Sequence, residues 1–345
     1  MKKTLGFAAI LLSMSLMGCS GGNTQETENQ AGAAETTAPS GESAPSADTE
    51  DTEEKEYQIA YLCPSMDNPF WRYMATGVER EAEKLGNVTV TTYDSKNSAD
   101  IQYTNAQDVI VKQVDGIVIS PTDSASCVAV LSLAEEAGIP VAISDIGTDS
   151  GEYVTYVQTN NLDGAREEGE YLASLLSEGD QVAEIVGPQA RQNQQHRKAG
   201  FEEGLSSSGA EVVDFRQMEK ENRSEGETYT QDYLTAYPEL KAIFCTNGDA
   251  TLGVLAACQA AGRDEVLIMG FDCNEELLEE IQAGTIAGIS AQQPILMGAK
   301  ALDGVIAHLN GEEVEQIQEV ETLLVTKDNI NEVYDTLTET AMVIE

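Results

Sequence analysis

The chain has 345 residues, of which 60 are acidic and 19 basic, so its net charge at pH 7 is −41. This length is sufficient for two domains of ordinary size. So negative a field repels nucleic-acid phosphates and anionic lipids, which argues against a nucleic-acid partner and against membrane binding through a basic patch. The charge predicts a solvated acidic surface, and it carries little information about a ligand.

The first 19 residues have the pattern of a lipoprotein signal peptide. Two lysines precede an apolar run at 5–17, which is too short to span a bilayer as a mature helix. The run leads into LMGC at 16–19, which resembles a bacterial lipobox, the motif whose cysteine receives a diacylglyceryl group. We therefore expect lipidation at Cys19 and a mature protein that is extracytoplasmic and anchored to the bacterial cell membrane.

Residues 20–56 are mostly Gly, Ser, Thr, Ala, Pro and Glu. A segment of this composition cannot bury enough apolar surface to fold. We expect a disordered acidic tether that holds the folded body away from the membrane.

Five cysteines follow Cys19, and neither their number nor their spacing suggests paired disulfides. We expect buried thiols that behave as small hydrophobic residues. They are Cys63, Cys127, Cys245, Cys258 and Cys273.

From residue 57 onward, short runs rich in Val and Ile alternate with amphipathic stretches. The first series predicts strands at 57–63, 88–94, 116–120, 140–144 and 153–158, and helices at 70–85, 101–112 and 125–137. The second predicts strands at 182–186, 212–216, 242–246, 266–270 and 286–290, and helices at 164–176, 194–206, 227–236, 252–261 and 275–282. A last helix at 295–309 is expected to return to the first lobe. The fold class is α/β, with two Rossmann-like lobes built on doubly wound parallel sheets.

Polar side chains fall at the carboxyl ends of the predicted strands, where open parallel sheets bind their ligands. They are Asn68, Asp145, Asn247, Asp272 and Gln292. A carboxylate accepts from neighbouring hydroxyls, and a carboxamide both donates and accepts. The guanidinium of Arg197 adds donors, and Phe70 and Trp71 offer a face for the C–H side of a sugar ring. The set predicts a site for a polyhydroxylated small molecule.

No catalytic pattern accompanies these residues. His196 and His308 lack a catalytic spacing to a nucleophile or carboxylate, and no phosphate loop, dinucleotide fingerprint or metal-ligand cluster is found. We predict a protein that is not an enzyme and that uses no cofactor or metal; acid–base chemistry by cleft carboxylates is a remote alternative. A transcription regulator of the same fold is rejected, because a signal peptide and spacer stand where a DNA-binding headpiece would be.

Short motifs in order along the chain point to one family. They are DNPFW at 67–71, PTDS at 121–124, GIPV at 138–141, RKAGF at 197–201, FCTN at 244–247, GFD at 270–272 and AQQP at 291–294. With these motifs, the body from 57 to about 325 resembles the ribose-binding subgroup of the type I periplasmic binding proteins.

This resemblance implies a monomeric, hinged two-lobe binder that passes its ligand to an ABC permease. It implies ligand contacts from Asn68, Phe70, Trp71, Asp145, Arg197, Asn247, Asp272 and Gln292. It places crossovers near 159–160, 292–293 and 321–322, so that an N-terminal lobe of 57–159 plus 293–321 faces a C-terminal lobe of 160–292 plus 322–345. A sensor that engages a membrane kinase or chemoreceptor would use the same binding chemistry and stays open as an alternative.

The chain departs from the ribose-binding pattern at two positions. Ile146 follows Asp145 where the ribose binders have an arginine, and Glu221 falls where they have an aromatic that closes the second-lobe side of the ring. Both positions are candidate ligand contacts. The departures argue against D-ribose and leave another aldose, a polyol or a hydroxyl-rich amine open.

Overall fold

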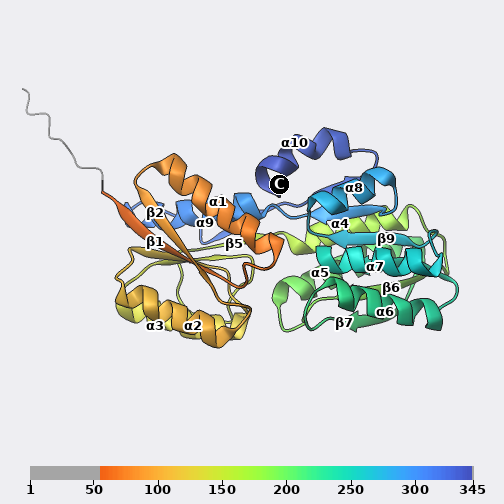
Figure 1. Ribbon diagram of the computed structural model, residues 1–345, viewed down its shortest axis with the longest axis horizontal. Helices are drawn as coiled ribbons and strands as arrows, with labels where there is room; N and C mark the ends of the chain where they lie inside the picture. Colours follow the sequence, from red (N-terminus) through yellow and green to blue (C-terminus); the bar gives the residue numbers. More distant parts are fainter. Residues whose placement is uncertain (1–54, 344–345) are drawn as a thin grey trace, which may run out of the picture. The chain divides into compact units, whose positions relative to one another are not determined.

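The computed structural model describes residues 55–343. The signal peptide, Cys19 and nearly all of the tether lie outside the described residues. Within 55–343, no helix is long and apolar enough to cross a membrane. The described chain forms two α/β lobes, each containing a six-stranded sheet (Figure 1).

The first lobe contains a sheet in the order β11-β5-β4-β3-β1-β2, in which every neighbouring pair is parallel. Its strands are β1 (Tyr57–Cys63), β2 (Val88–Asp94), β3 (Gly116–Ile119), β4 (Val141–Ser144), β5 (Thr155–Thr159) and β11 (Ile317–Val320). The helices α1 (Pro69–Leu85) and α9 (Pro294–Leu309) pack together on one face, and α2 (Ala99–Val111) and α3 (Ser124–Ala137) pack together on the other (Figure 1).

The second lobe contains a sheet in the order β12-β10-β9-β8-β6-β7. Its strands are β6 (Gln181–Val186), β7 (Glu211–Gln217), β8 (Leu240–Cys245), β9 (Leu267–Phe271), β10 (Gly288–Ala291) and β12 (Leu323–Thr326). Its helices are α4 (Asn161–Ala173), α5 (Gln192–Leu205), α6 (Arg223–Ala236), α7 (Gly248–Ala261), α8 (Glu275–Ala283) and α10 (Ile330–Thr340), with a short 3₁₀ turn at Ser206–Ser208.

The predicted fold class is confirmed, and the two lobes share one strand order. Leaving aside β11 and β12, each sheet follows the doubly wound order 2-1-3-4-5. One strand departs from the predicted parallel arrangement, because β12 is antiparallel to β10. The other strands of both sheets run toward the cleft between the lobes. A strand that enters the second lobe directly from β11 must run away from that cleft, so β12 is reversed.

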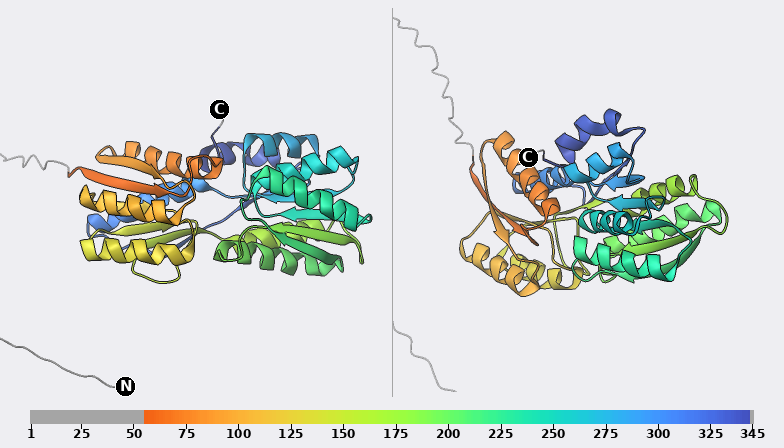
Figure 2. Two further views of the ribbon diagram at one scale, coloured as in Figure 1. Left: turned by 60° about the horizontal axis from the view of Figure 1, so that its bottom comes forward. Right: turned by 45° about the vertical axis from the view of Figure 1, so that its right-hand side comes forward.

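Within the described residues the chain passes between the lobes three times: from β5 to α4, from β10 to α9, and from β11 to β12 (Figure 2). Side chains tie these connections together. The hydroxyl of Thr159 donates to Gln292 Oε1 at 2.8 Å, and Gln293 Nε2 donates to the carbonyl of Glu321 at 2.6 Å. The three connections therefore form one hydrogen-bonded group beside the cleft.

The return of α9 to the first lobe depends on glycine. A Cβ atom at Gly77 would lie 2.0 Å from the carbonyl oxygen of Ile295, and one at Gly298 would lie 2.3 Å from that of Met74. The backbones of α1 and α9 thus approach closely, which places a late helix against the first one.

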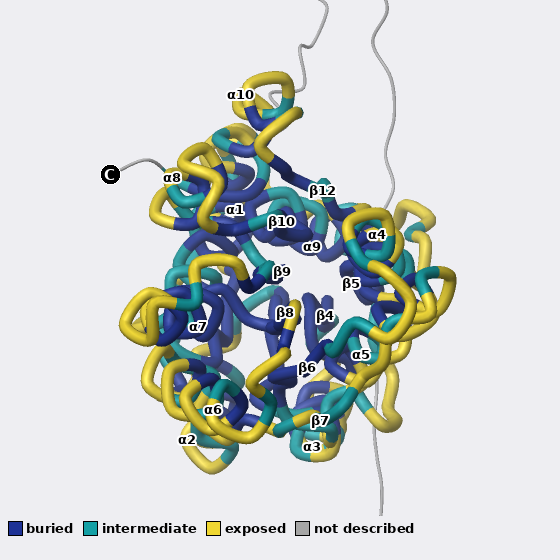
Figure 3. Tube along the Cα trace, turned by 90° about the vertical axis from the view of Figure 1, so that its right-hand side faces the viewer, coloured by how far each residue is buried: buried dark blue, intermediate teal, exposed yellow. Residues whose placement is uncertain are grey.

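Strands such as β4 and β6 are buried inside a layer of helices whose outer sides are exposed (Figure 3). The five described cysteines are buried free thiols, as predicted.

Candidate ligand-binding cleft

A cavity of about 250 Å³ lies between the lobes at the carboxyl ends of their strands. All ten residues singled out from the sequence lie on its walls: Asn68, Phe70, Trp71, Asp145, Ile146, Arg197, Glu221, Asn247, Asp272 and Gln292. The two sheets therefore bring these residues together, although their roles in ligand binding stay predictions.

The start of α1 shapes the first-lobe wall. Asn68 Oδ1 accepts a hydrogen bond from the amide of Phe70 at 2.9 Å and caps the helix, and Pro69 occupies its first position. This cap places Phe70 and Trp71 in the first turn, with their rings edge to face at 4.8 Å between centroids. Asn68 is thus both a cap and a cleft residue, and its amide nitrogen has no hydrogen-bond partner within 55–343.

Asp145 is held rigidly at the end of β4. Its backbone has a left-handed φ of 64°, its amide donates to the carbonyl of Val157, and its carbonyl accepts from the hydroxyl of Tyr156 at 2.8 Å. A left-handed non-glycine residue is strained, and such strain concentrates at functional positions.

The carboxylate of Asp145 lacks partners. Its Oδ1 atom is buried and has no hydrogen-bond partner among the described residues. Burial raises the pKa of Asp145 to about 6, although the positive charge of Arg197 opposes the shift. A ligand that donates hydrogen bonds would satisfy this oxygen.

Arg197 is the buried cation of the second-lobe wall. Its Nε donates to Asn161 Oδ1 at 2.7 Å, its Nη1 donates to the carbonyl of Thr246 at 2.8 Å, and its guanidinium lies 3.9 Å from the ring centroid of Phe271. These contacts fix the plane of the guanidinium. They use two of its five N–H groups, and the other three have no hydrogen-bond partner within residues 55–343.

Asp272 connects the second-lobe wall to the crossovers. It also has a left-handed φ, at 73°, and it accepts from the amide of Gly248 at 2.9 Å and from Gln292 Nε2 at 2.6 Å. Gln292 in turn accepts from Thr159 at the connection between the lobes. Asn247 caps α7 by accepting from the amide of Ala250 at 3.1 Å.

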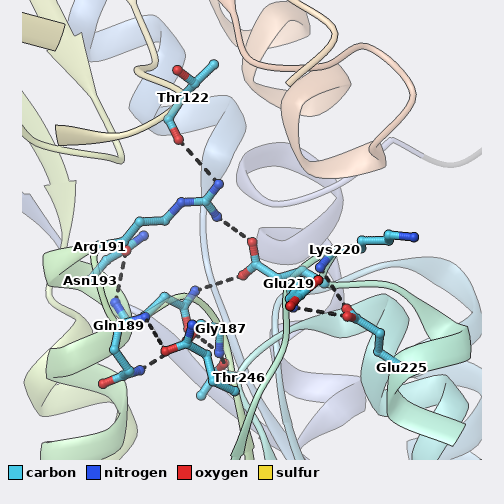
Figure 4. Close-up of polar contacts among 12 residues, drawn as sticks. Thr122, Gly187, Gln189, Arg191, Asn193, Glu219, Lys220, Glu225 and Thr246 are labelled. Carbon is cyan, nitrogen blue, oxygen red and sulfur yellow. Dashed lines mark hydrogen bonds and ion pairs between the residues drawn. The ribbon is translucent and has the colours of Figure 1, made fainter. Parts of the chain in front are cut away.

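Sequence reasoning missed a second cation, Arg191. It forms an ion pair with Glu221, and its Nη2 donates to the carbonyl of Thr122 in the first lobe at 3.3 Å (Figure 4). Glu221 also accepts from Gln194 at 3.3 Å and has a left-handed φ of 49°. The other lining residues that were missed are Ser65, Asp67, Asn97, Asn193, Gln194, Lys220, Asn222 and Asp249.

The sequence does contain an indication that Arg191 lies near the cleft. The loop that contains it follows the predicted strand 182–186, so it lies at a strand end like the residues that were found. Its length hides which of its polar side chains faces the cleft. Within 55–343, no group of three or more His, Cys, Asp or Glu side chains is placed to hold a metal ion.

A family model described as a periplasmic binding protein domain matches residues 59–313. The chain is also 31% identical over 269 residues to the ribose import binding protein RbsB of Escherichia coli (strain K12), an alignment that covers 78% of this chain and 90% of that protein. The chain belongs to the periplasmic binding protein family, as the motifs indicated.

Solved structures agree with this assignment. An ABC transporter solute binding protein from Bacillus halodurans with bound myo-inositol superposes with a TM-score of 0.76 at 25% identity, over 83% of this chain and 99% of that one. A periplasmic solute binding protein from Actinobacillus succinogenes with bound D-allose has the same fold, with a TM-score of 0.75 at 24% identity over 80% of this chain and 100% of that one. These relatives are named as binding proteins, in agreement with the prediction that the chain is not an enzyme.

Proposed function

We propose that this protein is an extracytoplasmic solute-binding protein that captures a monosaccharide or related polyhydroxylated molecule in the cleft and delivers it to an ABC importer. The observation that carries the proposal is the unpartnered carboxylate of Asp145, which faces guanidinium and carboxamide groups of the other lobe in a cavity with two aromatic rings. A ligand with several hydroxyl groups can donate to the carboxylate and accept from the guanidinium at once.

The same carboxylate links binding to closure. When the lobes meet without ligand, Asp145 is buried without a donor, which costs free energy. A bound hydroxyl group supplies the donor and removes that cost. Because the site residues come from both lobes, ligand stabilises the closed form by its additional contacts to the second lobe.

The proposal includes the placement of the protein and its lobes. Lipidation at Cys19 and the acidic tether 20–56 would hold a monomeric binder at the outer side of the membrane, within reach of the permease. The hinge would lie at 159–160, 292–293 and 321–322, dividing the body into 57–159 plus 293–321 and 160–292 plus 322–345. The hydrogen bonds among the three connections support this division.

The single tryptophan provides the test, because Trp71 lies on the cavity wall. Purified protein is titrated with pentoses, hexoses, inositols and nucleosides while its fluorescence and melting temperature are recorded. We expect saturable binding of at least one polyhydroxylated compound, together with a smaller radius of gyration in X-ray scattering. Absence of binding by every compound, or binding without compaction, would contradict the proposal.

A further inference from the structure

Arg191 is positioned unlike the other basic residues of the cavity. It is the N-cap residue of α5, but its side chain makes no capping hydrogen bond. Instead the side chain extends across the cleft to the first lobe, where it meets the carbonyl of Thr122 (Figure 4). This is a direct hydrogen bond between the lobes, formed by residues that belong to none of the three connections.

We propose that Arg191 is the closing residue of this binding site: Glu221 holds its guanidinium in place on the second lobe, and the guanidinium engages the first lobe only when the cleft is shut. The proposal rests on the proposed function, because it assigns Arg191 a part in retaining the ligand.

Glu221 is suited to hold the guanidinium before closure. Both partners belong to the second lobe, and each side chain is 15% exposed, so the ion pair is shielded from solvent. Glu221 receives a further hydrogen bond from Gln194, also of the second lobe. Its carboxylate is therefore engaged by protein donors, and its main contribution is to orient Arg191 rather than to bind the ligand.

The charges of the two walls explain why closure needs this residue. The first-lobe wall includes the carboxylate of Asp145 but no Lys, Arg or His among the described lining residues. The cations that act on Asp145 are Arg197 and Arg191, and both belong to the second lobe. Compensation of the buried charge thus arrives only when the lobes close. Arg197 is fixed within its own lobe, whereas Arg191 also bonds to the opposite lobe.

The consequence is kinetic. A contact that exists only in the closed form slows opening, and opening precedes ligand release. Loss of Arg191 is therefore expected to raise the dissociation rate constant at least tenfold and to change the association rate constant less than threefold. Loss of Glu221 is expected to raise the dissociation rate constant by a smaller factor, because Arg191 keeps its charge but loses its orientation.

Two measurements test this inference on R191Q, E221Q and the double variant. Stopped-flow fluorescence of Trp71 gives the rate constants for D-allose, myo-inositol or D-ribose, whichever binds the unaltered protein most tightly. Single-molecule energy transfer between dyes on cysteines introduced at the exposed residues Thr104 and Ser207 gives the closed fraction without ligand. The matched control is R216Q, which removes an exposed ion pair with Asp232 in the same lobe.

We expect R191Q to lower the closed fraction of the ligand-free protein and to speed ligand release. Adding E221Q to R191Q should have little further effect. R216Q should leave both the closed fraction and the release rate unchanged. An unchanged closed fraction in R191Q overturns the inference even if no probe binds. A lower closed fraction without binding of any probe supports the closing contact and contradicts the proposed ligand class. Unchanged dissociation with normal binding also overturns it.

Discussion

The two walls of the cleft are built from different kinds of side chain. The first lobe contributes both aromatic rings, Ile146 and the buried carboxylate of Asp145, and none of its described lining residues is basic. The second lobe contributes all three basic residues of the cavity, Arg191, Arg197 and Lys220, and its described lining residues include no apolar side chain.

This difference suggests that the two lobes act on the ligand at different stages of binding. Aromatic and aliphatic surfaces suit the C–H faces of a ring, so the first lobe can hold the ligand loosely while the cleft is open. On the proposed function, guanidinium and carboxamide groups of the second lobe would then contact its oxygen atoms. Specificity and retention would depend on the second lobe, and the pairing of its cations with Asp145 would couple the walls.

Replacement of Asp145 is expected to have the largest effect, because it removes the one carboxylate that joins the walls. We expect Asp145→Ala to weaken ligand binding by roughly 2–5 kcal/mol in isothermal calorimetry, since the ligand hydroxyls lose their acceptor and Arg197 loses the negative charge that lies near it. Asp145→Asn tolerates the left-handed backbone and keeps the shape but lacks the carboxylate, so its affinity should also fall; a loss seen only in the alanine variant would indicate a backbone effect. Unchanged affinity in the alanine variant would show that Asp145 does not bind the ligand.

Replacement of Arg197 tests the contribution of the second-lobe wall to ligand affinity. We expect Arg197→Lys to cost roughly 1.5–3 kcal/mol of affinity, because an ammonium keeps the charge but loses the planar fork that holds Asn161, Thr246 and the ligand together. The melting temperature of the ligand-free variant is recorded beside it. An affinity loss no larger than the loss of stability would mean that Arg197 supports the lobe and does not contact the ligand.

Much of this site was predictable, because strand ends are visible in the sequence. The predicted strand 57–63 coincides with β1, and Asn68, Asp145 and Asp272 reach the cleft because parallel strands of both sheets end there. What the sequence did not reveal is conformation within loops. The left-handed backbone of Asp145 and the pairing of Arg191 with Glu221 depend on tertiary contacts that no local pattern encodes.

The missed elements have a related cause. The strand β11 has four residues and includes the exposed Glu319, so it forms no apolar run that stands out. The strand β12 contains the apolar residues Leu323, Leu324 and Val325, but it is also only four residues long and was not recognised as a strand of the second sheet. They form strands because each pairs with the edge strand of one sheet, β11 with β5 and β12 with β10. The reversed direction of β12 follows from the path of the chain between the lobes rather than from its own residues.

The charge on Asp145 also predicts a pH dependence of closure. Its pKa is about 6 with the lobes together and returns toward 3.8 when opening exposes it, so the closed form binds the proton more tightly. Closure of the ligand-free protein should therefore become more favourable by about 1 kcal/mol as the pH falls from 7 to 5. The charged groups that act on this carboxylate are Arg197, Asp272, Arg191 and Glu221.

Energy transfer between dyes on the two lobes measures this effect across that pH range. Asp145→Asn has no proton to bind at this position and should show a flat profile with a larger closed fraction at pH 7. A profile in the variant as steep as that of the unaltered protein would assign the dependence to other groups.

The smallest expected effect concerns the aromatic surface of the first wall. We expect Trp71→Phe to weaken binding by about 0.5–1.5 kcal/mol, because phenylalanine keeps a ring edge to face with Phe70 but covers less of the ligand. Because this variant has no tryptophan, calorimetry gives its affinity, and stopped-flow energy transfer between dyes at Thr104 and Ser207 gives its rate constants. If the first wall holds the ligand before closure, the loss should appear in the association rate constant, in contrast to R191Q. If Trp71→Phe changes only the dissociation rate constant, both walls contact the ligand only after closure. The first lobe would then not hold the ligand while the cleft is open.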